Sequence, residues 1–207
     1  GSVLSPGGLL KVADTLRAAR RIKGFLGYDK GDRESSYPLL GGLTNDLNTY
    51  RDVEEAIFNA IISEEEISDS ASTLLRSIRR QIILKNDSIR NKLNSIISSS
   101  SNKKMLQDGI ITIREDRFVV PVKQEYRSSF PGLIHDQSSS GATLFIEPMS
   151  VVQLNNELKE LRLKEKAEIE RILAELTENV AAVNEGIKDN QKRLEQIDFI
   201  FAKGSYL

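Results

Sequence analysis

The sequence predicts a mainly α-helical protein with a small antiparallel β patch. Apolar residues recur at helical spacing along most of the chain, but between residues 110 and 146 they gather in short runs rich in Ile, Val, Thr and Phe. The chain has no Trp, is 6% aromatic and is 29% charged, which is typical of a helical protein with much surface. We therefore expect a helical core and a long antiparallel coiled-coil lever with a β tip.

The composition of the 207 residues excludes several kinds of site. Without cysteine there is no disulfide framework, thiolate metal site or cysteine nucleophile, and the single histidine, His135, excludes a multi-histidine metal centre. No apolar run reaches the 18 residues of a membrane span and no signal peptide is recognisable, so we expect a cytoplasmic protein without membrane contact. Residues 1–2 read as a remnant of cloning and are set aside.

The helical core is expected over residues 3–68. Proline suits the first turn of a helix over residues 6–26, which has an apolar face. The glycines and proline of residues 24–38 predict a loop, and short helices are expected near residues 39–48 and 53–61.

The first lever helix is expected within residues 69–108. Asp69 or Ser70 can cap a helix that runs to about Ile97, with apolar residues spaced mostly by three, four and seven. A flexible polar run, residues 98–102, ends this segment.

The second lever helix is expected over residues 149–207. Ten positions from Ile169 to Phe201 alternate spacings of four and three, and all except Asn190 are apolar, which indicates a coiled-coil seam. We expect one unbroken helix whose seam packs against the antiparallel helix of residues 69–97, because the β patch joins their ends.

Residues 109–148 contain the β patch. Four short runs predict antiparallel strands at residues 110–114, 117–123, 132–137 and 142–146, with turn residues between them. Such a patch is too small to form an independent enzyme core.

The near-zero net charge of −1 hides a strong local asymmetry. From Arg51 to Asp69 one base stands against seven acids, and from Arg76 to Lys104 eight bases stand against one acid. The basic segment favours an anionic partner. The alternative is a solvated helix whose bases pair with acids elsewhere in the fold.

Catalytic motifs are weak. Residues 135–140 contain the side chains of a Ser-His-Asp triad, but His135 and Asp136 are neighbours in a predicted strand and should point to opposite faces. The chain has no nucleophile elbow, phosphate-binding loop or dinucleotide motif. We assign it no enzymatic activity, metal or cofactor.

Three motifs carry a family likeness. The runs RFVVPVKQEYR (117–127) and GLIHDQSSSGATLFIEP (132–148), with LNNEL (154–158), resemble the second bacterial branch of the MutS family, which lacks the mismatch-recognition domain. Weaker likeness extends from Leu9 to the C-terminus.

The resemblance implies a helical core and a lever tipped by a β clamp at residues 109–148. In the parent protein it implies a homodimer, an ATPase domain that binds ATP and Mg²⁺, and a C-terminal Smr nuclease-like domain. We expect this chain to be a fragment that lacks these activities. The resemblance also implies a partner: branched or duplex DNA during suppression of recombination, or ribosomal RNA on collided ribosomes.

The family's use of the clamp on nucleic-acid backbones implies phosphate contacts by Arg117, Lys123 and Arg127, with Arg114 and His135 as further candidates. Strand alternation places Arg117 and Lys123 on one face of their strand and the apolar alternate residues, Phe118, Val120 and Val122, on the inward face. Tyr126 and Phe130 could stack on the ligand or belong to the local core. The alternative function is a coiled-coil scaffold for protein interaction or dimerisation without nucleic-acid contact.

Overall fold

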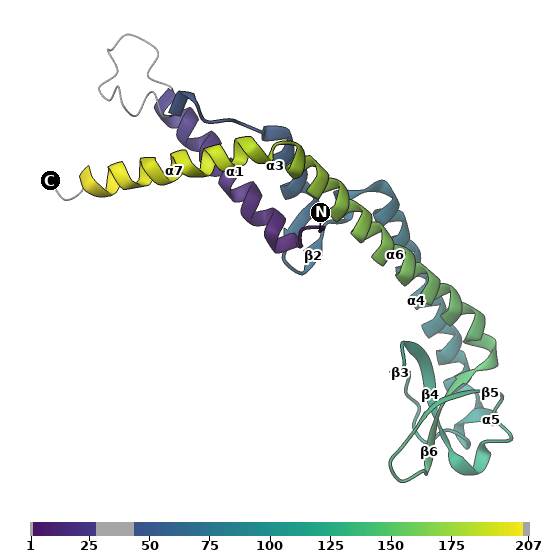
Figure 1. Cartoon of the computed structure of the whole chain (residues 1–207). Coiled ribbons are helices and arrows are strands. Elements are labelled where there is room, and N and C mark those ends of the chain that lie inside the picture. The colour runs from purple at the N-terminus through teal and green to yellow at the C-terminus, as the bar shows by residue number, and fades with distance from the viewer. Residues whose placement is uncertain (1, 28–43, 205–207) are drawn as a thin grey trace. The chain divides into compact units, whose positions relative to one another are not determined.

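The computed structural model describes residues 2–27 and 44–204 (Figure 1). The chain forms two compact units, which we call the core unit (residues 1–75 and 168–207) and the sheet unit (residues 76–167). The predicted class is confirmed, because the described chain is mainly helical with small antiparallel sheets. Half of the expected helix at 39–48, residues 39–43, lies outside the described residues.

The core unit packs helices from both ends of the chain. Its elements are α1 (Pro6–Gly27), α3 (Arg51–Ala60), the 3₁₀ turn η1 (Asp69–Ala71), α7 (Asn184–Gly204) and a two-stranded sheet of β1 (Ile61–Ser63) and β2 (Glu66–Ile67). The first residues of α4 (Thr73–Ser98) and the last turns of α6 (Met149–Ala182) complete it. Leu9, Leu16 and Ile57 are fully buried in its core.

The start of α4 differs from the prediction. Asp69 and Ser70 belong to the turn η1, so the expected cap at either residue is wrong. The Ser72 hydroxyl caps the helix instead, because it accepts a hydrogen bond from the Leu75 N–H at 2.9 Å. The same hydroxyl donates to the Glu168 carboxylate at 2.7 Å, which ties the cap to α6 inside the core unit.

The expected single helix after Pro148 is interrupted at Val183, which separates α6 from α7. The Val183 N–H bonds to the carbonyl of Val180, three residues back, so the turn is tighter than an α-helical one. Just beyond it, a side chain at Gly186 would collide with the Tyr50 hydroxyl. The bare glycine backbone therefore lets the start of α7 approach α3 closely.

The apolar seam of residues 169–201 packs mainly on α1 and α3 in the core unit, where the start of α4, at Leu75, shares its cluster. Leu176 and Val180 pack into the core with α1 and α3, while Ile197 packs with Ala19 and Leu47. Helices α1 and α3 offer apolar faces to the same stripe and occupy it. A long coiled-coil lever therefore stays a prediction.

Asn190, the polar exception in that seam, is fully buried. Its amide accepts from the Asn48 N–H and donates to the Asn48 carbonyl, both at 2.7 Å. The residue therefore fixes the register of α7 against the segment before α3.

The sheet unit contains the predicted antiparallel sheet of β3 (Thr112–Arg114), β4 (Arg117–Lys123), β5 (Gly132–Gln137) and β6 (Thr143–Pro148). The strand order is β3-β4-β6-β5, so β3 and β5 are the edges. The serine-rich run expected to be flexible continues into the short helix α5 (Ser100–Lys103), and the 3₁₀ turn η2 (Gln124–Tyr126) follows β4.

One face of the sheet packs against two helices. Phe118, Val120 and Val122 point inward, as predicted. They share a cluster with residues of α4 and α6, namely Ile89, Leu93, Val151 and Leu158. Phe130 and Tyr126 join this cluster, which assigns both aromatic rings to the local core.

The α4 and α6 segments of the sheet unit run antiparallel. Arg79 pairs with Glu165 at 2.7 Å and Lys85 with Glu157 at 2.5 Å, in opposite sequence order. The hydrogen bond from Lys85, with a second from Gln153, lowers the pKa of Glu157. Among the described residues, no helix is long and apolar enough to cross a membrane.

Candidate nucleic-acid interface

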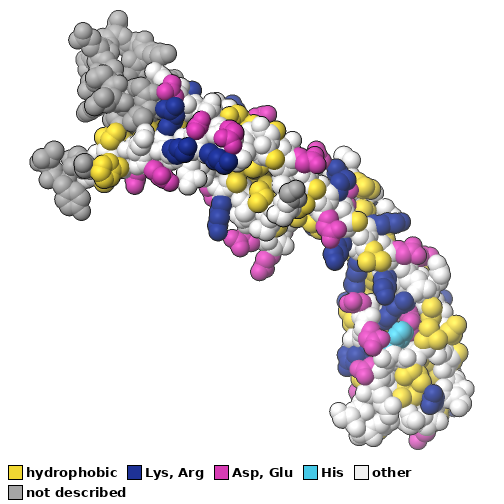
Figure 2. Space-filling view, viewed as in Figure 1, with side chains coloured by type: hydrophobic (Ala, Val, Ile, Leu, Met, Phe, Trp, Pro, Cys, Tyr) yellow, Lys and Arg dark blue, Asp and Glu magenta, His cyan; other side chains and the backbone are white. Residues whose placement is uncertain are grey.

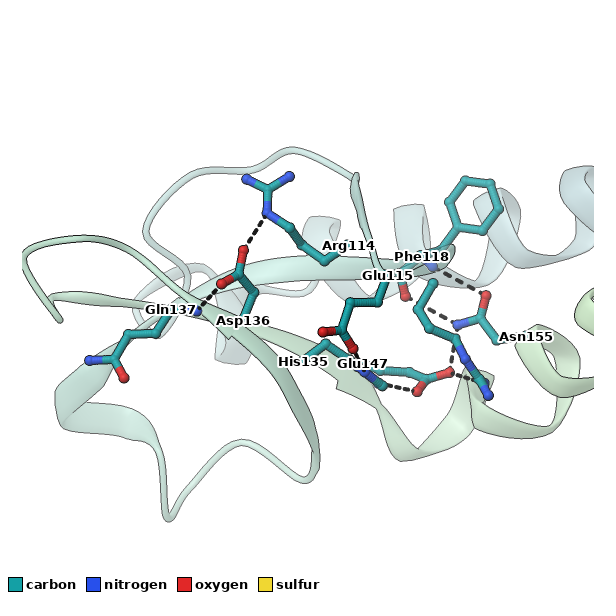
Figure 3. A network of polar contacts seen from close by, with 9 residues as sticks. Arg114, Glu115, Phe118, His135, Asp136, Gln137, Glu147 and Asn155 are labelled. Atoms are coloured by element: carbon teal, nitrogen blue, oxygen red, sulfur yellow. Dashed lines mark hydrogen bonds and ion pairs between the residues drawn. The ribbon is translucent and has the colours of Figure 1, made fainter.

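A buried carboxylate, Glu147, is the centre of a network of polar contacts in the sheet unit (Figure 3). It is fully inaccessible to solvent and accepts from Arg117 Nη1 at 3.1 Å and Asn155 Nδ2 at 2.7 Å. His135 Nε2 lies 2.6 Å from its other oxygen. Because a buried charge without partners is strongly unfavourable, these contacts account for the position of Glu147 inside the sheet unit.

Asn155 connects α6 to the sheet. Its Oδ1 accepts from the Phe118 N–H and its Nδ2 donates to the Phe118 carbonyl, both at 3.2 Å, in addition to the bond to Glu147. Neither Glu147 nor Asn155 was among the site residues that the sequence predicted. The available signals were an acid at the end of an otherwise apolar strand and an asparagine on the apolar side of a helix.

A β-bulge changes the predicted geometry of His135 and Asp136. The register of β5 against β6 shifts between Ile134 and Asp136. The two neighbouring side chains therefore reach partners on one face of the sheet, since His135 contacts Glu147 and Asp136 pairs with Arg114 at 2.9 Å. The expectation of opposite faces is wrong, because strict alternation fails at a bulge.

No catalytic triad forms from these residues among the contacts of the described chain. His135 is directed at Glu147. The Ser138 hydroxyl accepts from the Thr143 N–H at 3.1 Å and stabilises the turn between β5 and β6. Within the described residues, no three His, Cys, Asp or Glu side chains lie close enough together to hold a metal ion.

Arg114, on the edge strand β3, is also held within the sheet. Its guanidinium pairs with Asp136 and lies 4.1 Å from the centroid of the Phe145 ring. Glu115, in the turn after it, lies 3.9 Å from His135 Nδ1. Figure 2 shows the histidine at the surface among acidic and basic side chains. Three of the five candidate phosphate contacts, Arg114, Arg117 and His135, thus have internal acidic partners.

The other two candidates lie at the end of the sheet. Lys123 donates from Nζ to the Lys104 carbonyl at 3.2 Å, which brings the end of β4 beside the segment after α5. Arg127 is exposed, and its guanidinium has no hydrogen bond or ion pair with any described residue. Lys103, Lys104, Lys123 and Arg127 form what we call the tip cluster.

A serine turn lies beside the tip cluster. The Gln124 N–H donates to the Ala142 carbonyl at 3.0 Å, which joins η2 to the β5–β6 connection. Gly141 closes this connection with φ of 75°, a conformation that favours glycine. Ser139 and Ser140 are exposed, so hydroxyl groups and ammonium groups share this end of the sheet.

The two units carry opposite charge. The sheet unit has 16 Lys and Arg against 10 Asp and Glu, a net charge of +6, whereas the core unit has 13 against 20, a net charge of −7. Within the sheet unit, each ion pair such as Arg117–Glu147 cancels one positive and one negative charge. The excess positive charge therefore resides on exposed lysines and arginines.

The fold and site define a mainly α-helical protein with a basic, sheet-bearing unit. No family model matches the chain. Curated relatives do, each named "Endonuclease MutS2": the chain is 61% identical over 204 residues to that of Alkaliphilus oremlandii, 57% over 204 to that of Clostridioides difficile and 52% over 206 to that of Clostridium acetobutylicum. These matches cover 99–100% of the chain and 26% of each relative.

The chain belongs to the MutS2 branch of the MutS family, as the three sequence motifs implied. It spans about a quarter of the length of the curated relatives that it matches.

Proposed function

We propose that the sheet unit binds the sugar-phosphate backbone of nucleic acid and acts as the clamp of a MutS2 protein, without reading base sequence. The ligand is duplex or branched DNA, or ribosomal RNA on collided ribosomes. The observation that carries the proposal is the tip cluster, where the exposed Lys103, Lys104 and Arg127 and the half-buried Lys123 lie at the same end of the sheet as exposed serine hydroxyls. These are the groups that contact phosphates in protein–nucleic acid complexes.

The five candidate residues have different parts in this proposal. Lys123 and Arg127 contact phosphates directly. Arg117 and His135 contact the buried Glu147 and so hold the shape of the sheet, while Arg114 stiffens its edge through Asp136. Residues bound to internal carboxylates offer less net charge to a phosphate than unpaired ones do.

We also propose where the activities of the longer parent protein lie. We assign the ATP and Mg²⁺ sites, the nuclease activity in the relatives' name and the surface for homodimerisation to regions outside residues 1–207, in a cytoplasmic protein. Purified residues 1–207 should accordingly show no ATP hydrolysis and no DNA cleavage. ATP hydrolysis or DNA cleavage that co-purifies with this chain through every purification step would contradict the assignment.

The test is an anisotropy titration of the chain with fluorescein-labelled duplex DNA, a four-way DNA junction and a ribosomal RNA hairpin over a range of salt. With the tip cluster on phosphates, log K should fall with log[salt] with a slope of roughly −3 to −4, because each phosphate contact contributes about −0.9 on duplex DNA. Binding that does not change with salt, or no binding to any of the three, would contradict the proposal.

A matched pair of variants locates the contact. Lys123→Ala/Arg127→Ala should reduce the slope by about 2, whereas Lys159→Ala/Lys164→Ala removes the same charge from exposed positions of α6 and should change it far less. Equal losses from the two variants would mean that binding responds to net charge alone.

An apolar groove in the core unit favours the second candidate function, a scaffold for protein interaction. A cavity of about 480 Å³ lies between α1 and α7 and is lined by Ile22, Phe25, Leu194 and Ile197, with Phe25 83% exposed. Exposed apolar surface of this kind marks docking sites. Concentration-dependent association in analytical ultracentrifugation that Phe25→Ser abolishes, together with no DNA or RNA binding, would favour this function over the first.

A further inference from the structure

A second surface of the sheet unit presents polar side chains other than those of the candidate residues. A shallow groove of about 530 Å³ runs along α4 and is lined by Leu84, Ser88, Asn91, Lys92, Ser95 and, from α6, Leu154. The four polar residues follow the spacing i, i+3, i+4 and i+7, so they lie on one face of the helix. Both helices belong to the sheet unit in this region, so the groove lies within one compact body.

The polar groups in the groove are available. Ser88, Asn91 and Lys92 are exposed, and their side chains make no hydrogen bond or ion pair with any described residue. Ser95 donates its hydroxyl to the Asn91 carbonyl at 3.0 Å and keeps its oxygen lone pairs. Folding therefore leaves an ammonium, an amide and hydroxyls directed at solvent.

No carboxylate lines the groove. The Glu157 carboxylate on α6 is bound by Lys85 at 2.5 Å and by Gln153 at 3.0 Å. Asp87, one turn before Asn91 on α4, is not among the residues that line the groove. The local charge is therefore positive, which attracts an anion. Lysine, serine and asparagine together are the side chains that bind phosphate and sugar oxygens in nucleic-acid complexes.

We propose that this α4 groove is a second binding site for a nucleic-acid backbone, with Lys92 on a phosphate and Ser88, Asn91 and Ser95 on phosphate or sugar oxygens. The inference rests on the proposed function, since it assumes that the sheet unit binds nucleic acid. It adds a contact on the helix to the one at the tip cluster. A strand held at two places on one compact unit is fixed in direction as well as in position.

The shape of the groove agrees with this ligand. The groove, of about 530 Å³, is shallow and open to solvent along the helix, so a backbone phosphate with its sugar can approach it from outside. Leu84 and Leu154 supply apolar surface that the carbon atoms of a sugar can contact.

The first test measures affinity and salt dependence for a short duplex DNA. Lys92→Ala should lower the affinity about threefold to tenfold at low salt and reduce the salt slope by about 1. Lys159→Ala, which removes the same charge from an exposed site on α6, should have a clearly smaller effect. Equal effects of the two variants would overturn the inference.

The second test uses the absence of cysteine from the chain. A benzophenone maleimide attached to Ser88→Cys should cross-link to the bound duplex on illumination. The control is Ser77→Cys, an exposed site of α4 about three turns away, 11 residues at 1.5 Å each or roughly 16 Å. Cross-links from both sites alike, or from Ser88→Cys to a second copy of the chain instead of DNA, would overturn the inference.

The outcomes separate the two proposals. Wild-type chain that binds no nucleic acid overturns the proposed function and this inference together. Wild-type chain that binds, with a loss in Lys123→Ala/Arg127→Ala but none in Lys92→Ala, leaves the proposed function intact and overturns the α4 groove alone.

Discussion

The two units bury an acidic residue in the same way, but their net charges have opposite signs. Each buries a carboxylate and neutralises it with arginine: Glu54 accepts two hydrogen bonds from Arg20 at 2.8 Å in the core unit, and Glu147 pairs with Arg117 in the sheet unit. The difference lies in what remains after the pairing. The net charge is −7 in the core unit and +6 in the sheet unit, so the charge that supports the fold can be separated from the charge available to a ligand.

Both units also use a buried asparagine to hold a helix. Asn190 binds both backbone groups of Asn48, and Asn155 binds both backbone groups of Phe118. In the sheet unit the asparagine additionally bonds to the buried Glu147. The interior of the sheet unit is thus a coupled network, whereas the corresponding contact in the core unit stands alone.

The largest expected effect comes from breaking that network at its charge pair. Arg117→Ala leaves Glu147 buried with only His135 and Asn155 as partners, so the free energy of unfolding should fall by about 3 kcal/mol. Urea unfolding followed by circular dichroism measures it. Arg127→Ala, an exposed unpaired arginine in the same unit, should change stability by less than about 0.5 kcal/mol. Similar losses from both variants would show that Glu147 does not depend on Arg117.

The next effect concerns Asn155. Asn155→Ala leaves the Phe118 N–H and carbonyl without partners inside the protein, and we expect a loss of about 2 kcal/mol of unfolding free energy in the same assay. Asn155→Asp keeps the size but places a carboxylate where the amide donates to Glu147, so it should be at least as destabilising. A stable aspartate variant would show that the hydrogen bond from Asn155 to Glu147 contributes little to stability.

Asn190→Ala tests the simpler arrangement in the core unit. It removes the two bonds to Asn48 at a fully buried position, and we expect a loss of about 1–2 kcal/mol. Gln191→Ala, at the exposed neighbouring position, is the control and should be close to neutral. If Asn190→Ala cost more than Asn155→Ala, the comparison of a single contact with a coupled network would fail.

Much of the fold could be predicted from local patterns. The change from helical spacing to short β-rich runs located all four strands of the sheet, and the inward face of β4 followed from alternation. The partner of the apolar seam could not be predicted, because periodicity identifies an apolar face but not what covers it. Helices α1 and α3, more than 100 residues away in sequence, cover it.

The candidate site was predicted in part. The basic residue types and their strands follow from the sequence, but their partners depend on register. One bulged residue in β5 puts His135 and Asp136 on the same face, and no local signal marks it. Lys104 joins Lys123 only because the segment after α5 pairs with the end of β4.

The prediction that depends most on conditions concerns Glu168 in the core unit. Hydrogen bonds from Arg171 and then from the Ser72 hydroxyl lower the pKa of Glu168 from 4.5 to about 2. Since the folded state holds the charged form, this carboxylate contributes its full stabilisation above about pH 4.5 and loses it as the pH falls towards 2.

Glu168→Gln should therefore make the free energy of unfolding less dependent on pH between about pH 2 and 4.5. The slope of this free energy against pH should fall by the equivalent of up to one proton taken up on unfolding. Glu170→Gln, at the exposed position two residues along α6, is the control and should follow the wild-type curve more closely. Urea titrations at several pH values give the slope. A Glu168→Gln curve parallel to the wild type would mean that the Arg171 and Ser72 contacts do not favour the charged carboxylate. The junction of α4 and α6 in the core unit would then be held by apolar packing around Leu75 and Ile172.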